Sequence, residues 1–130
     1  MREYKFRGYS NEYKRWFYGS LLVDEAQKSY YIVDDMTGIA VEVIKETIGQ
    51  YTGLKDKNRK EIYESDIVKY RLQNHKTNEI YYENFEVIWN NETASYTIKN
   101  NTKGTLCIDY VSQSGELIGN IYDNKELLEV

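Results

Sequence analysis

Proline is absent from this chain of 130 residues, and cysteine occurs only once, as Cys107. Average proteins contain about 5% proline, and proline on an edge strand is one common way to keep a sheet from pairing with other chains. Any sheet here therefore relies on charges, bulges or covering segments to protect its edges. A single cysteine permits no disulfide within the chain and excludes a zinc site built from cysteines. We expect Cys107 to be a small buried apolar side chain.

Long apolar runs are also missing. Met1 is followed by the charged residues Arg2, Glu3 and Lys5, so the start of the chain lacks the apolar stretch of a signal peptide. No apolar run reaches about 18 residues, the length of a membrane-spanning helix. These absences argue against secretion and against a membrane partner. Together with the single cysteine, they predict a cytoplasmic protein.

The common catalytic motifs are absent as well. The sequence contains no GxGxxG, GxxxxGK[ST], HExxH or GxSxG pattern, so the usual sites for dinucleotides, phosphates, zinc and acyl-enzymes have no basis. The only histidine, His75, lies in a polar run and is expected in a solvent-exposed loop. One imidazole cannot form a multi-histidine metal site. The sequence therefore predicts no catalytic residue, no metal and no cofactor.

Acidic residues offer the remaining route to catalysis. Three acidic pairs could approach each other for acid–base or magnesium chemistry: Asp34 with Asp35, Glu64 with Asp66, and Asp109 with Glu116. Short acidic pairs at strand ends more often form turns, and Asp66 is expected to accept backbone N–H groups there. An enzyme that acts on a small ligand through Asp66, Gln50 or His75 is therefore only the third functional hypothesis.

Tyrosine dominates what the chain does contain. Its 14 tyrosines supply most of an aromatic fraction of 15%, and a tyrosine can pack its ring while its hydroxyl reaches water or a partner. The net charge is −4, and basic and acidic segments alternate along the chain. That alternation argues against nonspecific binding to duplex nucleic acid, which needs an uninterrupted basic surface.

Alternating apolar and polar residues predict an all-β fold. Runs of β-branched and aromatic residues are separated at short intervals by turn residues, as in antiparallel sheets. The expected strands cover residues 3–7, 15–23, 29–34, 40–44, 47–52, 61–63, 67–72, 84–90, 94–99, 105–110 and 116–122. Helical content is limited to short turns, within residues 21–28 or 41–47 and over residues 126–128. We expect one domain over residues 1–130, with a twisted, mostly antiparallel sheet that is either open or curled into a partly open barrel.

The stretch from Ile48 to Tyr70 is the most informative part of the chain. It has the pattern of a strand, a tight turn and a second strand, and Gly53 is expected to end the first strand with a positive φ. The five polar residues from Asp56 to Lys60 form the expected hairpin tip. In the returning strand, Val68, Tyr70 and Leu72 alternate with polar side chains, so these three are expected to face the core.

This stretch, IGQYTGLKDKNRKEIYESDIVKY, closely resembles the signature of the YopX family of phage and prophage proteins. Three further pieces agree with that family: REYKFR at the start, IGNIY near the end and NKELLE after it. The resemblance implies a YopX-like domain, a phage or prophage origin and the cytoplasm of a bacterial host cell. It names no reaction.

Two positions depart from the family signature. Arg59 and Ser65 stand where the family usually has glycine. If the backbone keeps a left-handed conformation there, each change costs about 1 kcal/mol. Asn58 can itself adopt that conformation, so a shifted turn is the alternative.

The candidate binding residues come mainly from the signature. Its polar residues are expected to cluster near one end of the hairpin: Gln50, Tyr51, Thr52, Asp56, Asn58 and Asp66. Asn120 lies in a second loop that could serve the same surface or form a bulge. Trp16, with Phe17 and Tyr18 beside it, offers an aromatic cluster of the kind found at interface hot spots.

These features favour a phage or prophage accessory protein that acts as a non-catalytic protein-binding module. Its partner would be a host or phage protein, or a second copy of the chain. The alternative is a small β-barrel that binds single-stranded nucleic acid, because aromatic and basic residues interleave between Tyr4 and Trp16 and bases can stack on such rings.

Overall fold

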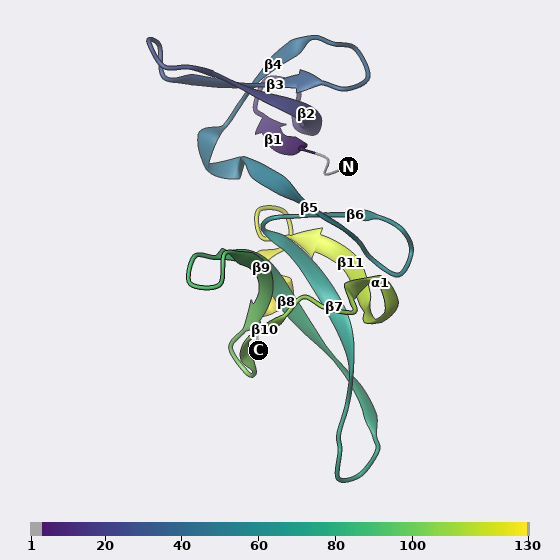
Figure 1. Cartoon of the computed structure of the whole chain (residues 1–130). Helices are drawn as coiled ribbons and strands as arrows, with labels where there is room; N and C mark the ends of the chain where they lie inside the picture. The colour runs from purple at the N-terminus through teal and green to yellow at the C-terminus, as the bar shows by residue number, and fades with distance from the viewer. Residues whose placement is uncertain (1–3, 130) are drawn as a thin grey trace. The chain divides into compact units, whose positions relative to one another are not determined.

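The computed structural model describes residues 4–129, and every strand pairing in it is antiparallel. The strands form two sheets (Figure 1), which confirms the all-β prediction. The chain divides into two compact units, one ending at Gly53 and the other beginning at Leu54. Each unit has its own hydrophobic cluster. The expectation of one domain over residues 1–130 stays a prediction.

The first unit is a curled antiparallel sheet. Its elements are β1 (Phe6–Ser10), β2 (Arg15–Asp24), β3 (Ser29–Asp34), β4 (Ala40–Val43), the short 3₁₀ helix η1 (Lys45–Thr47) and β5 (Gly49–Lys55). The strand order in this sheet is β4-β3-β2-β1-β5-β6. Strand β5 continues past Gly53, the last residue of the unit. Just after β4, the N–H of Ile44 donates to the Tyr9 carbonyl of β1 at 3.0 Å, so the two ends of the four-stranded part approach each other.

The core of this unit consists of Phe17, Ile32, Val41 and Val43. Gly8 lies against this core, and a Cβ built on it would lie 2.7 Å from the Val43 side chain. A larger residue at position 8 would therefore separate β1 from β4.

The second unit contains the other sheet. Its elements are β6 (Glu61–Tyr63), β7 (Asp66–Gln73), β8 (Ile80–Asn90), β9 (Ser95–Asn100), β10 (Gly104–Cys107), α1 (Val111–Ser114), β11 (Gly115–Asn120) and the 3₁₀ helix η2 (Lys125–Leu128). The strand order is β10-β9-β8-β7-β11. In each sheet the first and last strands of the order do not pair with each other. Neither sheet therefore closes into a barrel within residues 4–129.

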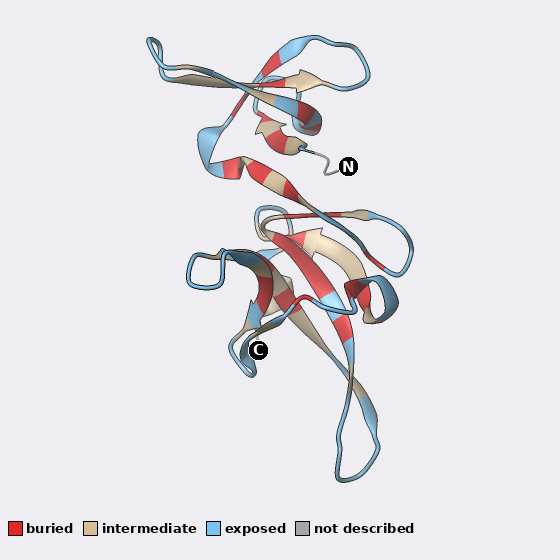
Figure 2. Ribbon diagram, viewed as in Figure 1, coloured by how far each residue is buried: buried red, intermediate tan, exposed pale blue. Residues whose placement is uncertain are grey.

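The core of the second unit lies on the face of β7 that the sequence predicts. Val68 and Tyr70 are buried and Leu72 packs against them half-buried, and Figure 2 shows the buried residues along β7 and β8. The Tyr70 hydroxyl donates to the Ile108 carbonyl at 2.9 Å. Burial, with Asp109 nearby, raises the pKa of Tyr70 well above its usual range, so this hydroxyl stays a donor. Ile67 is fully buried as well, although it points to the other face.

Several local expectations were wrong. Gly53 has the expected positive φ of 84°, but it does not end the strand, because β5 continues to Lys55. Of the two ranges expected to hold a helical turn, residues 41–47 contain η1, while residues 21–28 form the end of β2 and a turn. Residues 108–110 lead into α1 instead of extending β10. Cys107 is exposed. The expected first strand begins at Glu3, outside the described residues, and the described strand begins at Phe6.

One loop geometry recurs at the hairpins. In six loops the first residue is Ser, Asp or Asn, and its side-chain oxygen accepts an N–H from two or three residues ahead: Ser10, Asp24, Asp34, Asn74, Asn90 and Asn100. Four residues after each of these, the backbone has a positive φ: Lys14, Lys28, Gly38, Asn78, Ala94 and Gly104. The short polar side chain starts the turn, and the left-handed residue returns the chain to the next strand.

Within residues 4–129, no helix is long and apolar enough to cross a membrane.

Candidate functional site

Asp56 of the signature is a buried structural carboxylate. Its Oδ1 accepts the N–H groups of Asn58 at 2.9 Å and Lys60 at 2.8 Å. Its Oδ2 accepts the N–H of Leu117, 61 residues further along the chain, at 2.8 Å. The side chain is 2% exposed. One carboxylate therefore closes the hairpin tip and ties it to β11.

Asp66 and Asn120 form a second tie between the signature and β11. The Asp66 side chain, 1% exposed, accepts the Tyr63 N–H at 2.7 Å, which is the turn role that the sequence predicts. Asn120 is the register partner of Asp66 on β11. Its Oδ1 accepts the N–H groups of Tyr122 and Asp123, each at 2.9 Å. The loop that Asn120 starts is thus held by its own side chain.

The two departures from the family signature both adopt the left-handed conformation. Arg59 has φ 66° and Ser65 has φ 74°, so the alternative of a shifted turn is not used. The Ser65 N–H donates to the Val87 carbonyl at 2.8 Å, and its carbonyl accepts from Ile121 at 3.0 Å. Hydrogen bonds on both sides hold this strained residue in place.

The other signature residues lie on β5, in the first unit. Tyr51 is buried, and Gln50 and Thr52 are half-buried. The Tyr51 N–H donates to the Lys5 carbonyl at 2.7 Å, and the Lys5 Nζ lies 5.8 Å from the centroid of the Tyr51 ring. The other predicted residues belong to the second unit: Asp56, Asn58, Asp66 and Asn120. The predicted site is therefore divided between the two compact units. The role of these residues in binding stays a prediction.

Trp16 lines a hollow of about 510 Å³ on the first unit. We call it the β2 hollow. It lies between the start of β2 and the loop that joins β3 to β4, and its lining residues are Arg15, Trp16, Phe17, Tyr18, Asp34, Asp35, Met36 and Thr37. Met36 is 90% exposed and Tyr18 is 41% exposed. Sequence reasoning missed Met36, because a single methionine in a polar loop carries no periodic signal.

The rings near the start of the chain mostly pack on one another and on neighbouring cations. Tyr9 and Trp16 meet edge to face with their centroids 5.5 Å apart, and the Arg7 guanidinium lies 4.7 Å from the Trp16 ring centroid. Arg15 lies 4.1 Å from the ring centroid of Phe17, a core residue. Tyr9, Trp16 and Phe17 are thus part of the packing of the unit, whereas Tyr4 and Tyr13 are 66% and 57% exposed. Binding of single-stranded nucleic acid by this strip stays a prediction.

Two carboxylates, Asp34 and Asp35, line the β2 hollow together with its aromatic rings. Asp34 starts the loop from β3 to β4 and accepts the Thr37 hydroxyl at 3.2 Å. Asp35 lies beside Lys5, with 3.9 Å between its Oδ2 and the lysine Nζ. The β2 hollow therefore combines exposed apolar surface with charges of both signs.

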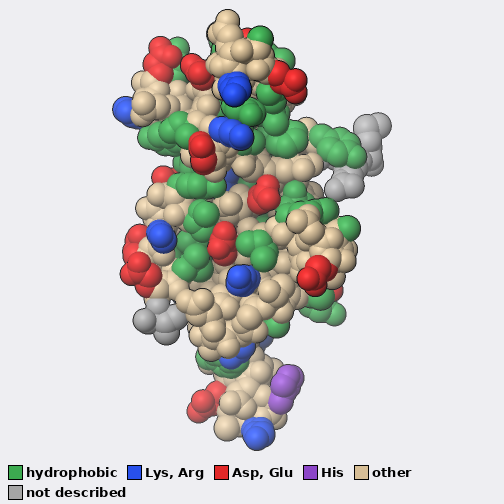
Figure 3. All heavy atoms as spheres, turned by 90° about the vertical axis from the view of Figure 1, so that its left-hand side faces the viewer, with side chains coloured by type: hydrophobic (Ala, Val, Ile, Leu, Met, Phe, Trp, Pro, Cys, Tyr) green, Lys and Arg blue, Asp and Glu red, His purple; other side chains and the backbone are tan. Residues whose placement is uncertain are grey.

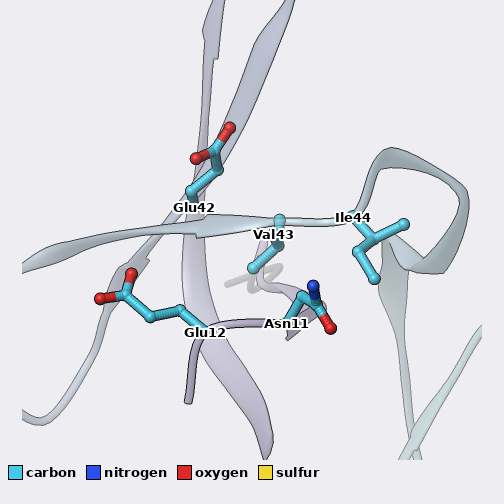
Figure 4. A pocket seen from close by; sticks show the side chains of 5 residues that line it. All are labelled: Asn11, Glu12, Glu42, Val43 and Ile44. Atoms are coloured by element: carbon cyan, nitrogen blue, oxygen red, sulfur yellow. The ribbon is translucent and has the colours of Figure 1, made fainter. Parts of the chain in front are cut away.

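A second hollow of about 440 Å³ lies beside β4, lined by Asn11, Glu12, Glu42, Val43 and Ile44. Figure 4 shows the carboxylates of Glu12 and Glu42 on one side of Val43 and the Asn11 amide on the other. Across residues 4–129, no group of three or more His, Cys, Asp or Glu side chains could hold a metal ion.

The fold defines an all-β protein of two antiparallel sheets. Its β2 hollow is lined by aromatic and charged side chains. A family model described as YopX protein matches residues 5–129. The chain belongs to the YopX family.

One solved structure extends this result. The crystal structure of protein EF1440 from Enterococcus faecalis is similar to this chain with a TM-score of 0.61 and 23% sequence identity. The similarity covers 99% of this chain and 100% of that chain. At this identity the likeness shows the fold alone. No curated protein matches the chain.

Proposed function

We propose that this protein is a non-catalytic protein-binding module and that the β2 hollow is its contact surface. The partner would be a host or phage protein or a second copy of the chain. A phage or prophage origin and the host cytoplasm, which the family resemblance implies, belong to the same proposal.

The composition of the β2 hollow carries this proposal. Met36, Tyr18 and Trp16 place a methionine and two aromatic side chains at one site, and these residue types are enriched in the centre of protein interfaces. Met36 is 90% exposed, and an exposed large apolar side chain gains most when a partner covers it.

The carboxylates favour a protein over a nucleic acid at this hollow. Asp34 and Asp35 stand among its lining residues, where they would repel a phosphate backbone. A protein surface can offer lysine or arginine to these carboxylates and apolar side chains to the rings. Charges of both signs around an apolar centre are the usual rim of a protein interface.

A photo-crosslinking experiment tests the proposal. A photoreactive phenylalanine analogue is placed at position 36 of the full chain in the bacterium that naturally carries it. We expect an adduct with one specific protein, or with a second copy, from position 36. The same analogue at Gln27, exposed in the loop that joins β2 to β3 at the other end of these strands, should give no such adduct.

The Met36→Ala variant supplies the quantitative test. With the adducted partner purified, we expect Met36→Ala to weaken binding at least tenfold, because truncating an interface anchor commonly costs more than about 1.4 kcal/mol. Gln27→Ala should bind as the unchanged chain does. A chain that is monomeric by light scattering and gives no adduct from position 36 contradicts the proposal.

A further inference from the structure

A two-stranded arm extends from the sheet of the second unit. β11 pairs with β7 only as far as Tyr70, and β9 pairs with β8 only from Glu86 onward. Between these points β7 and β8 pair only with each other. The register pairs are Arg71 with Tyr82, Leu72 with Tyr81 and Gln73 with Ile80. Figure 1 shows this ribbon running away from the sheet, and Figure 3 shows the only histidine at its free end.

One face of the arm has an unusual composition. Side chains opposite each other in an antiparallel pair share a face, and alternate residues along a strand return to it. We call this set the arm face. It begins at Lys69, just before the two-stranded part, and its members are Lys69, Arg71, Gln73, Ile80, Tyr82 and Asn84. None of them is acidic, in a chain with 21 Asp and Glu residues.

Four carboxylates lie near this face. Glu86 follows Tyr82 on the same side of β8 and is opposite Lys99 of β9, and Glu129 lines a hollow together with Tyr82 and Glu83.

Glu83 and Glu116 have cationic partners. Glu83 lies 3.0 Å from Lys103, measured from Oε2 to Nζ. Glu116, opposite Lys69 on β11, lies 3.8 Å from the Nζ of Lys57. Glu83 and Glu116 are thus paired with lysines outside the arm face. Lys69 and Arg71 are not needed to neutralise these two carboxylates, so the arm face favours an anionic partner.

Tyr82 gives the arm face a ring between two cations. It is 54% exposed, the Lys69 Nζ lies 5.2 Å from its ring centroid, and Arg71 is directly opposite on the neighbouring strand. Lys69 and Arg71 are two residues apart, about 6.6 Å along the strand. Successive phosphates of one stacked strand are displaced by about 3.4 Å along the helix axis. Because they also wind around that axis, the distance between them is larger, so two cations at this spacing suit neighbouring phosphates.

We propose that the arm face binds single-stranded nucleic acid. A base stacks on the exposed ring of Tyr82, the backbone phosphates contact Lys69 and Arg71, and the Gln73 amide reaches a base edge. An open ring beside cations is the arrangement by which proteins hold single strands with little sequence preference. An acidic peptide would match the charge but would leave the ring without a planar partner. The proposal concerns a different surface from the β2 hollow, and either one can fail without the other.

Fluorescence anisotropy with a labelled oligothymidylate of about 15 nucleotides tests the proposal on the full chain. At low salt we expect saturable binding. Tyr82→Ala should weaken it about tenfold, and Tyr82→Phe, which keeps the ring, should retain it. Changing Lys69 and Arg71 together to glutamine should lower the slope of log affinity against log salt by about 1.4, because each phosphate contact on a single strand contributes about 0.7.

Matched variants elsewhere on the chain serve as controls. Tyr13→Ala removes a ring of similar exposure, 57%, from the N-terminal strip, and Lys28→Gln removes an exposed cation from a loop of the first unit. Both should bind like the unchanged chain. The proposal is overturned by flat anisotropy at low salt, by unchanged binding in Tyr82→Ala, by weakening in Tyr13→Ala instead, or by a polyglutamate peptide that binds as tightly as the oligonucleotide.

Discussion

Asp56 and Asp66 show how this chain buries carboxylates. Both are almost fully buried, and the partners that the structure gives Asp56 are backbone N–H groups. Burial of a charge costs free energy unless hydrogen bonds replace its water, and hydrogen bonds to an ionised acceptor are stronger than neutral ones. The turn role of Asp66 could be predicted from sequence, because aspartate commonly accepts nearby N–H groups. The bond from Asp56 to Leu117 could not, because local spacing says nothing about a partner 61 residues away.

Removal of the Asp56 carboxylate should destabilise the second unit. Asp56→Ala leaves the N–H groups of Asn58, Lys60 and Leu117 without their acceptor. Leu117 is half-buried and the other two residues are exposed, and an N–H left unsatisfied in a buried site costs about 1–3 kcal/mol. We expect the free energy of unfolding to fall by about 2 kcal/mol or more in urea titrations. Asp123→Ala, at an exposed loop position, is the comparison and should cost less. Equal losses in the two variants would contradict the structural role given to Asp56.

Glu86 should make stability depend on pH. It lies on the central strand β8, opposite Ile67 and Lys99, and burial raises its pKa above the ordinary 4.5, while Lys99 lowers it by less. The folded state therefore holds this proton more tightly than the unfolded state. The resulting stability is fully present below pH 4.5 and is lost as the pH rises through the raised pKa.

Glu86→Gln removes this titration. We expect the free energy of unfolding of the variant, relative to the unchanged chain, to rise from below pH 4.5 to neutral pH. Urea titrations at several pH values measure this difference. A difference that stays constant over that range would show that burial of Glu86 does not affect its proton affinity.

At the scale of elements, the positions of the hairpin loops could be predicted from sequence, but the backbone conformations within them could not. Turn residues located the loops well, because Ser, Asp and Asn at strand ends accept N–H groups two or three residues ahead. The positive φ of Lys28 and Ala94 had no sequence signal, since neither residue favours that conformation. The geometry of the whole loop imposes it.

Glycine should relieve this strain. Ala94 has φ 51° and Arg59 has φ 66°, and an L-residue in that region costs about 1–2 kcal/mol. Glycine loses part of that gain through the entropy of the unfolded chain, so Ala94→Gly and Arg59→Gly should each raise the free energy of unfolding by about 0.5–1 kcal/mol. Thr93→Gly, one residue before Ala94, should lower it or leave it unchanged. Stabilisation by Thr93→Gly as well would contradict the conformational explanation.

Sequence reasoning missed α1 and misjudged the burial of Cys107, for two different reasons. α1 has four residues, Val111–Ser114, and follows Tyr110 in the left-handed conformation, so it is too short for a helical period. Cys107 was expected to be buried because it continues an apolar run. It ends β10, an end strand of the sheet, and residues of such a strand have a neighbouring strand on one side only.

For the whole molecule, alternation in the sequence was enough to predict an antiparallel all-β fold. It could not predict two compact units, because both sheets have the same alternation and no linker rich in glycine or serine separates them. The division falls inside a strand, β5, directly after Gly53. The two hydrophobic clusters share no residue, and this separation has a measurable consequence.

The two tryptophans report on the two units separately. Trp16 lies in the first unit and Trp89 in the second, so the Trp89→Phe and Trp16→Phe backgrounds each leave one fluorescent probe. Ile32 and Ile98 are matched core residues, at 0% and 1% exposure, and truncation of a buried isoleucine to alanine costs about 2–5 kcal/mol.

We expect each core substitution to act mainly on its own unit. In urea titrations, Ile32→Ala should lower the transition that Trp16 reports more than the one that Trp89 reports, and Ile98→Ala should do the reverse, because a cavity weakens the cluster that contains it. Coincident transitions that shift equally with both probes would instead show a single cooperative domain. That result would support the sequence prediction of one domain over residues 1–130 and would show that the two cores unfold as one.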